Sequence, residues 1–257
     1  MLDGLFEAAR LASANRLESN TTADLEQLIS KLSAPVDVYS ALSKSSHIKL
    51  IAEIKRRSPS RGFLADIPDP TAQGELYERH GAHAISVLTE ESGFGGSLED
   101  LEKVSAKVGI PTLRKDFISN EYQILEARAA GADFVLLILS WLKPTDYQRL
   151  LAFAHELGLG VLTETHAEPE IDVAVDSGAR LVGINTRDLQ TFKTDIGLFE
   201  KLANRLDASA IAVAESSVKS LEDVVRYRNA GADVALVGEA LVTGDPSKLI
   251  PEFIKVS

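Results

Sequence analysis

The stretches GAHAISVL (81–88), GADFVLLI (131–138), GARLVGIN (178–185) and GADVALVG (231–238) share one pattern and recur at intervals of 50, 47 and 53 residues. In each of them a glycine ends a helix-like segment and precedes a short apolar run. Glycine is common just after a helix C-cap, because a positive φ there meets no Cβ. The apolar run is typical of a strand that is buried on both faces. The pattern therefore predicts a repeated helix–strand unit.

Four further apolar runs, at 50–54, 110–113, 160–163 and 211–214, lie between these stretches. Together they predict eight strands that end near residues 55, 88, 115, 139, 164, 185, 215 and 238, each followed by a helix. Alternating strands and helices form a parallel sheet with right-handed crossovers. Eight such units fit a single closed (β/α)8 TIM barrel, and an open doubly wound sheet is the alternative.

One domain is expected over 1–257, because no linker rich in proline, glycine or serine interrupts the repeat. Residues 48–257 hold the eight strand–helix units. Residues 1–47 form an N-terminal helical extension of two or three capping helices, one of them near 23–32, that covers one end of the barrel.

The composition excludes several classes of protein. The 27 Lys and Arg against 38 Asp and Glu give a net charge of −11, which disfavours nucleic acid or an anionic membrane as the main partner. The absence of cysteine excludes disulfides and thiolate chemistry and fits a cytoplasmic location. With five His in the chain, we expect no metal cluster. The charged N-terminus is unlike a signal peptide, and no apolar stretch is long enough to span a bilayer.

Polar side chains gather at the carboxyl ends of the predicted strands, where a barrel of this kind carries its active site. Side chains two apart on a strand share a face. Singly, each of these residues fits a solvated strand end, but together two lysines and three glutamates at one barrel mouth predict paired acid–base catalysis without a metal. The set comprises Glu53 and Lys55 on the face of Ile51, Lys115 with Leu113, Glu164 with Leu162, Glu215 with Val213, and Asn185.

A phosphate site is expected between the loops after the seventh and eighth strands. The matching segments carry Ser216 with Ser217 and Gly238 with Glu239, and Ser58 after the first strand adds a hydroxyl. The glycines at 93–96 lack the spacing of a dinucleotide fingerprint, so we expect no cofactor. His166, after the fifth strand, fits a structural role better than proton transfer.

With these residues in view, the sequence resembles the indole-3-glycerol-phosphate synthase family over nearly its whole length. The resemblance rests on IAEIKRRSPSRG (51–62), ISVLTEESGFGGS (85–97), LRKDFI (113–118), ADFVLLI (132–138), GINTRDL (183–189), VAES (213–216) and LVGEAL (236–241). It implies ring closure, decarboxylation and dehydration of 1-(2-carboxyphenylamino)-1-deoxyribulose 5-phosphate to indole-3-glycerol phosphate. The partner is then a small anion with a carboxylate and a phosphate, and the protein is a monomer or weak dimer.

The resemblance also implies residue roles. Lys115 is the general acid that polarises the ketone, Glu164 is the general base or stabilises the iminium charge, and Lys55 holds the substrate carboxylate. The other implied contacts are Glu53, Asn185 and Glu215 for positioning and proton transfer, Ser58, Ser217, Gly238 and Glu239 for the phosphate, Phe94, Phe117, Leu136 and Leu189 for the aromatic ring, and Arg187 facing the ligand. Ser217 stands where the family usually has glycine, and Glu239 where some members have serine.

Two other interpretations remain open from the sequence. One is a different phosphosugar barrel such as an isomerase, although isomerases use another acid–base set than Lys55, Lys115 and Glu164. The other is a degenerate barrel that binds without catalysis, which the complete set of charged site residues does not favour.

Overall fold

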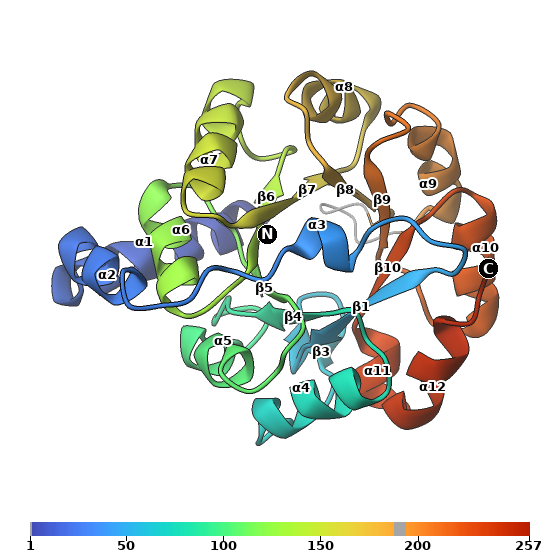
Figure 1. Ribbon diagram of the computed structural model, residues 1–257, viewed down its shortest axis with the longest axis horizontal. Coiled ribbons are helices and arrows are strands. Elements are labelled where there is room, and N and C mark those ends of the chain that lie inside the picture. The colour runs from blue at the N-terminus through green and yellow to red at the C-terminus, as the bar shows by residue number, and fades with distance from the viewer. Residues whose placement is uncertain (1, 188–193) are drawn as a thin grey trace.

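Eight parallel strands close into a barrel in the computed structural model, which describes residues 2–187 and 194–257 (Figure 1). The barrel strands are β1 (Lys49–Ile54), β4 (Ala84–Leu88), β5 (Thr112–Lys115), β6 (Phe134–Ile138), β7 (Gly160–Thr165), β8 (Leu181–Asn185), β9 (Ile211–Glu215) and β10 (Val234–Val237). Each strand pairs with its neighbour in the chain, and β10 pairs with β1. The (β/α)8 barrel is confirmed, and the doubly wound alternative is wrong.

Helices follow every barrel strand and pack around its outside (Figure 1). They are α4 (Pro70–Arg79), α5 (Leu98–Ser105), α6 (Glu121–Ala129), α7 (Pro144–Glu156), α8 (Glu168–Asp176), α9 (Ile196–Ala203), α10 (Leu221–Asn229), α11 (Glu239–Thr243) and α12 (Pro246–Phe253). A short antiparallel hairpin of β2 (Arg57–Ser58) and β3 (Gly62–Phe63) interrupts the connection between β1 and α4.

The repeat seen in the sequence corresponds to these helix–strand joints. Gly81, Gly131, Gly178 and Gly231 all have positive φ, between 68° and 99°, one residue after a helix C-cap. The strand expected at 110–113 instead begins at Thr112, just after Pro111, which has no N–H for the sheet ladder.

Two apolar cores lie on the two faces of the closed sheet. Leu113, Leu162 and Val213 belong to the cluster inside the barrel, whereas Leu50 and Val135 belong to the cluster between strands and helices. This alternation confirms which side chains point inward. The charged residues that share a face with Leu113, Leu162 and Val213 are therefore aimed at the barrel mouth.

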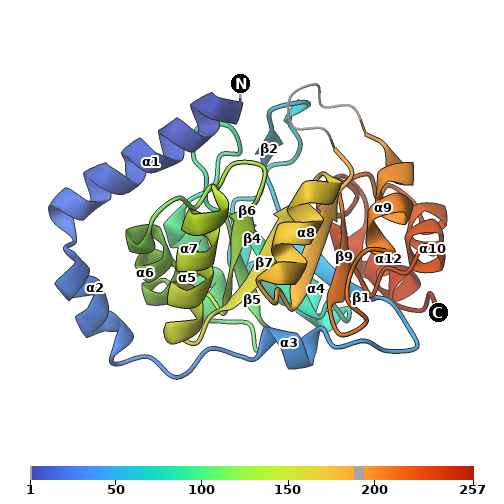
Figure 2. The same ribbon diagram turned by 90° about the horizontal axis from the view of Figure 1, so that it is seen from above.

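The N-terminal extension forms α1 (Leu2–Ser19), α2 (Thr22–Ile29) and α3 (Val38–Ala41). Figure 2 shows α1 above one end of the barrel, α2 along its side and α3 below the other end. Phe6 of α1 stacks on Trp141, with ring centroids 4.0 Å apart, near the carboxyl ends of the strands. Val38 of α3 joins the core inside the barrel and contacts Gly160 at the amino end of β7. The extension thus reaches both ends of the barrel, because apolar side chains of α1 and α3 pack against the core inside the barrel at the two ends.

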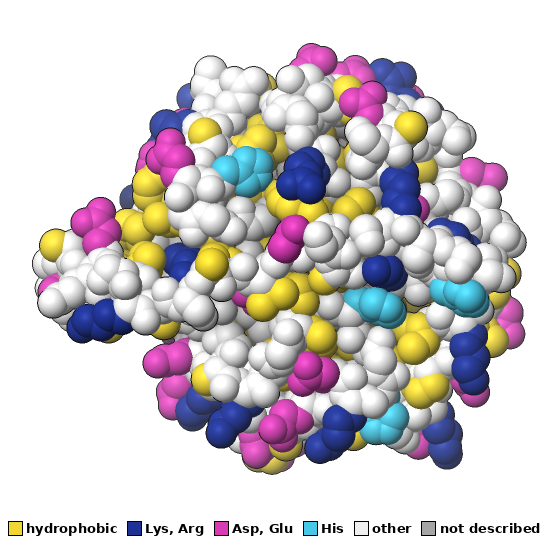
Figure 3. Space-filling model, viewed as in Figure 1, with side chains coloured by type: hydrophobic (Ala, Val, Ile, Leu, Met, Phe, Trp, Pro, Cys, Tyr) yellow, Lys and Arg dark blue, Asp and Glu magenta, His cyan; other side chains and the backbone are white. Residues whose placement is uncertain are grey.

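Figure 3 views the face crossed by α3, where basic and acidic side chains are interspersed. Within residues 2–187 and 194–257, no helix has the length and apolar character needed to cross a membrane.

Candidate active site

One pocket opens at the carboxyl ends of the barrel strands, on the side opposite α3. It brings together every predicted site residue that the structure describes, while Leu189 lies outside the described residues. The predicted residues in its wall are Glu53, Lys55, Ser58, Phe94, Lys115, Phe117, Leu136, Glu164, Asn185, Arg187, Glu215, Ser216, Ser217, Gly238 and Glu239.

Lys115 lies between two carboxylates from alternate strands. Its Nζ donates to Glu164 Oε2 at 2.9 Å and to Glu215 Oε2 at 2.8 Å. Asn185 Nδ2 donates to the other oxygen of Glu164 at 3.1 Å, and Ser216 Oγ donates to Asn185 Oδ1 at 2.8 Å. Residues at the carboxyl ends of β5, β7, β8 and β9 therefore form one hydrogen-bonded cluster at the floor of the pocket.

The two carboxyl groups of this cluster differ in the direction in which their pKa values are shifted. Burial lowers the pKa of Lys115, but the carboxylates of Glu164, Glu215 and Glu53 outweigh it and leave that pKa above its usual value. Burial raises the pKa of Glu164, and attraction by Lys115 and His166 more than reverses this, so the net shift is downward. Burial, reinforced by the charge of Glu164 and partly offset by Lys115, raises the pKa of Glu215 to about 7. Near neutral pH, one ionised and one partly protonated carboxyl group share the lysine, an arrangement suited to acid–base catalysis.

A second ion pair joins Lys55 Nζ to Glu53 Oε1 at 2.5 Å. Two glycines make room for the buried carboxylates. A Cβ on Gly238 would lie 2.3 Å from Glu53 Oε1, and a Cβ on Gly183 would lie 2.0 Å from Glu215 Oε1. The structure thus gives Gly238 a steric function at the acid–base cluster, and it shows that Gly183, which sequence reasoning did not single out, is needed for Glu215.

The turn after β9 has an uncommon backbone. Ser216 and Ser217 both have positive φ, 68° and 63°, a conformation that costs a non-glycine residue about 1–3 kcal/mol. Thr186 Oγ1 donates to Ser217 Oγ at 3.2 Å, and Tyr227 Oη donates to the carbonyl of Ser216 at 3.3 Å. Thr186 and Tyr227 are themselves 3.0 Å apart. These two buried side chains hold the strained turn in place beneath the pocket.

The carboxylate of Glu239 is neutralised by the loop after β1. Arg61 Nη2 donates to Glu239 Oε1 at 2.5 Å, and Arg187 Nη1 donates to Ser60 Oγ at 3.0 Å. Burial raises the pKa of Glu239, but the Arg61 contact and charge dominate and lower it overall. The acidic residue next to the expected phosphate site is therefore ionised, and its charge is paired.

Apolar side chains also line the pocket. Phe94 and Phe117 have ring centroids 6.3 Å apart with their planes tilted by 47°, and Leu136 and Ile138 line the same pocket. Leu5 of α1 also reaches the pocket. Sequence reasoning missed Leu5, because no local pattern reveals where a preceding helix docks.

Glu90 is a second residue that was missed. It is buried, and its carboxylate accepts the backbone N–H groups of Ser92, Gly93 and Phe94 at 2.7–3.1 Å. It fixes the turn that presents Phe94 to the pocket. Two acidic residues followed by Ser-Gly (90–93) shortly after a strand were the available sequence signature.

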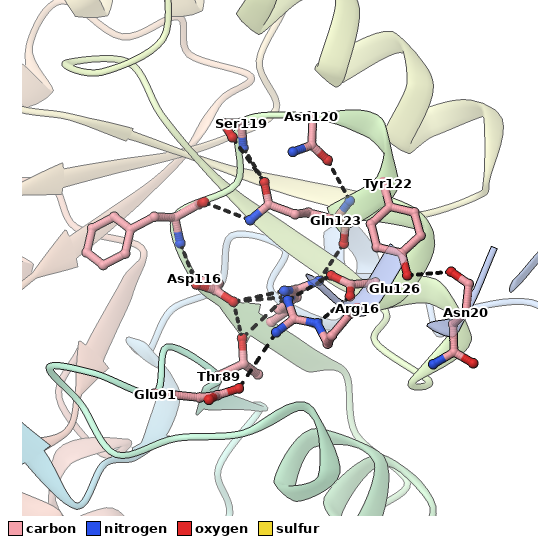
Figure 4. A network of polar contacts seen from close by, with 12 residues as sticks. Arg16, Asn20, Thr89, Glu91, Asp116, Ser119, Asn120, Tyr122, Gln123 and Glu126 are labelled. Atoms are coloured by element: carbon pink, nitrogen blue, oxygen red, sulfur yellow. Dashed lines mark hydrogen bonds and ion pairs between the residues drawn. The ribbon is translucent and has the colours of Figure 1, made fainter. Parts of the chain in front are cut away.

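A buried polar network supports the strand that carries Lys115 (Figure 4). Arg114 is fully buried and contacts Asp116 at 2.9 Å and Glu126 of α6 at 3.2 Å. Arg16 of α1 reaches the same Glu126 at 2.5 Å. The network therefore ties the end of β5 to a barrel helix and to the N-terminal extension.

Comparisons with known proteins found one family and similar relatives over nearly the whole chain. The sequence profile of the family described as "Indole-3-glycerol phosphate synthase" matches residues 4–253. A protein of that name from Leifsonia xyli subsp. xyli is 51% identical, with 98% of this chain and 97% of the relative covered. The protein of that name from Parafrankia sp. is 46% identical, with 98% and 94% covered. "Indole-3-glycerol phosphate synthase 1" of Streptomyces coelicolor is 44% identical, with 99% and 94% covered.

Proposed function

This chain belongs to the indole-3-glycerol phosphate synthase family, and from the geometry of its pocket we propose which of its residues carry out that family's reaction. The reaction is the conversion of 1-(2-carboxyphenylamino)-1-deoxyribulose 5-phosphate to indole-3-glycerol phosphate, carbon dioxide and water. The enzyme is a carboxy-lyase of tryptophan biosynthesis that acts on a small phosphate-containing substrate. The single observation that carries the assignment is the position of Lys115 between Glu164 and Glu215.

Ring closure joins the ring carbon that bears the carboxylate to the ketone carbon. Lys115 donates a hydrogen bond and then a proton to the ketone oxygen, which becomes a hydroxyl group. Glu164, ionised and 2.9 Å from Lys115, stabilises the positive charge that develops on the ring nitrogen. The carbon–carboxylate bond then breaks, and its electron pair returns to the ring as carbon dioxide leaves.

Dehydration needs an acid for the departing hydroxyl and a base for the adjacent carbon. The pair of Lys55 and Glu53 supplies one of each at 2.5 Å. Lys55 also attracts the substrate carboxylate before it is lost. Asn185 orients Glu164, and Glu215 buffers the charge on Lys115 and accepts a hydrogen bond from a sugar hydroxyl.

The two ends of the substrate match two kinds of wall. The phosphate is assigned to Ser58, Ser216, Ser217, Gly238 and Glu239, the last through its backbone N–H, with Arg187 nearby. The aromatic ring is assigned to Phe94, Phe117 and Leu136, and Leu189 stays a sequence prediction. A cytoplasmic location and a monomeric or weakly dimeric state also stay predictions.

The assignment is tested by the fluorescence of indole-3-glycerol phosphate formed from the substrate in the presence of EDTA. Lys115→Met should lower kcat by about 10²–10⁴-fold. Lys103→Met is the matched control, because Lys103 is exposed and pairs with Glu99 of its own helix. Near-normal turnover by Lys115→Met would remove Lys115 from the mechanism.

A further inference from the structure

His166 lies directly behind Glu164, one of the two carboxylates that contact Lys115. It follows β7 and shares a strand face with Glu164, two residues earlier. Its Nε2 lies 3.3 Å from Glu164 Oε1, and its Nδ1 lies 3.6 Å from Glu170 Oε2 of α8. The side chain is 13% exposed and is not part of the pocket wall. His166 therefore meets the site residues through its contact with Glu164 and not by contact with the pocket itself.

The surroundings of the ring favour its charged form. Both ring nitrogens are buried, and neither makes a hydrogen bond of good geometry within residues 2–187 and 194–257. Burial lowers the pKa of the imidazole, but contact with Glu170 and the charges of Glu164, Glu170 and Glu215 reverse this and raise it. The charge of a buried imidazolium between two carboxylates is balanced by their negative charges. A neutral ring in the same place would leave its buried nitrogen atoms without hydrogen-bond partners.

The two carboxylates that share Lys115 differ in their other polar neighbours. Oε2 of Glu164 accepts a hydrogen bond from Lys115, whereas Oε1 accepts one from Asn185 and lies 3.3 Å from His166 Nε2. Glu215 has Lys115 on Oε2, and its Oε1 has no hydrogen-bond partner among the described residues. Glu164 therefore has two polar neighbours besides Lys115, and of these two only His166 can carry a positive charge.

We propose that His166 is a positioning residue that holds Glu164, rather than Glu215, as the ionised carboxylate beside Lys115. The proposal rests on the proposed role of Glu164. Glu170 contacts the other ring nitrogen of His166, Nδ1, and acts on the site through His166. It lies in the first turn of α8, and its Oε2 accepts the backbone N–H of His166 at 2.7 Å.

The test is the pH dependence of kcat/KM for His166→Gln. Loss of a cation this close to a carboxylate raises the pKa of that carboxylate by about 1–3 units. The acidic limb of the profile should therefore move to higher pH by about 1–3 units, so that activity on that limb falls about tenfold or more. KM at high pH should change less than twofold, roughly the scatter expected when no substrate contact is lost.

A charge-only variant separates electrostatics from structure. Glu170→Gln keeps an oxygen that can accept the His166 N–H but removes the charge that favours the imidazolium. It should move the acidic limb in the same direction by a smaller amount, and it should have no further effect when combined with His166→Gln. His155→Gln is the matched control, because His155 lies on α7 and contacts Tyr39 away from the pocket.

The outcomes are distinct. In one outcome, the acidic limbs of His166→Gln and Glu170→Gln coincide with that of the unmutated enzyme, while Glu164→Gln is inactive. This result overturns the role of His166 and leaves the proposed function intact. Full activity of Glu164→Gln overturns the assignment of Glu164 itself. If His166→Gln fails to fold, as circular dichroism would reveal, the shift in Glu170→Gln decides the proposal by itself.

Discussion

Replacing Arg114 by methionine should destabilise the protein strongly without any direct contact with the pocket. The Arg114 guanidinium is fully buried and donates to Thr89, Asp116, Glu126 and the carbonyl of Gln123. Methionine fills most of the space of the arginine stem, so the main effect is the loss of a charge and of its hydrogen bonds. Asp116 and Glu126, both less than a tenth exposed, would lose their shared cation.

Removing one partner of a buried ion pair costs about 3–5 kcal/mol. Here the lower figure, about 3 kcal/mol, is expected, since Arg16 still contacts Glu126 and Thr89 still donates to Asp116. With a urea m-value of about 3 kcal/mol/M, the unfolding midpoint should fall by about 1 M. Arg114→Lys should be intermediate, because one ammonium cannot bridge both carboxylates as a guanidinium does.

Urea unfolding followed by circular dichroism measures this difference. Arg149→Met is the control, because Arg149 is about half exposed, and its pairs with Asp146 and Glu121 resemble surface ion pairs worth about 0–1 kcal/mol each. Its midpoint should stay within about 0.3 M of the unmutated protein. An equally small change in Arg114→Met would refute the view that this network stabilises the barrel.

Three further predictions concern the pocket. Gly238→Ala should lower kcat/KM at least about tenfold in steady-state assays, because its Cβ would lie 2.3 Å from Glu53 Oε1, and an unchanged value would contradict the steric argument. The pKa of Glu215 is raised from its usual 4.5 to about 7, so its contribution to stability is present below about pH 4.5 and is lost as the pH rises through 7. Urea titrations at pH 5 and pH 8 should therefore show a smaller loss of stability on raising the pH for Glu215→Gln than for the unmutated protein. Arg61→Met should raise KM several-fold, because it leaves the Glu239 charge unpaired near the phosphate site. Adding Glu239→Gln should reverse the increase. An unchanged KM in Arg61→Met would show that this ion pair has no part in phosphate binding.

The architecture could be predicted from the sequence because it depends on local, repeated patterns. The glycines at 81, 131, 178 and 231 end helices through their own backbone freedom, and each apolar run marks a strand buried on both faces. The predicted strand ends fall within one residue of the observed ends. The start of β5 was placed too early, because a proline at 111 does not interrupt an apolar run but cannot donate to the ladder.

The inward-facing site residues could be predicted for the same reason. Strand alternation puts Lys115, Glu164 and Glu215 on the inner face of the sheet, and their common position at strand ends puts them at one mouth of the barrel. The same reasoning does not reach Leu5, Glu90 and Gly183. Their place in the pocket depends on how a preceding helix docks, how a loop folds back on one carboxylate, and how much space a neighbouring strand leaves.

By itself, the sequence determined the strand–helix repeat, the end of the barrel that carries the chemistry and the identity of the charged groups, because short-range periodicity fixes these properties. Only the tertiary structure decided how the charges are divided. Lys115 pairs with two carboxylates, the His166 ring lies 3.3 Å from just one of them, and Arg61 neutralises Glu239 from 178 residues away. Proton affinities in a buried cluster depend on distances of a few ångströms between residues far apart in the chain, and no pattern of spacing along the sequence contains those distances.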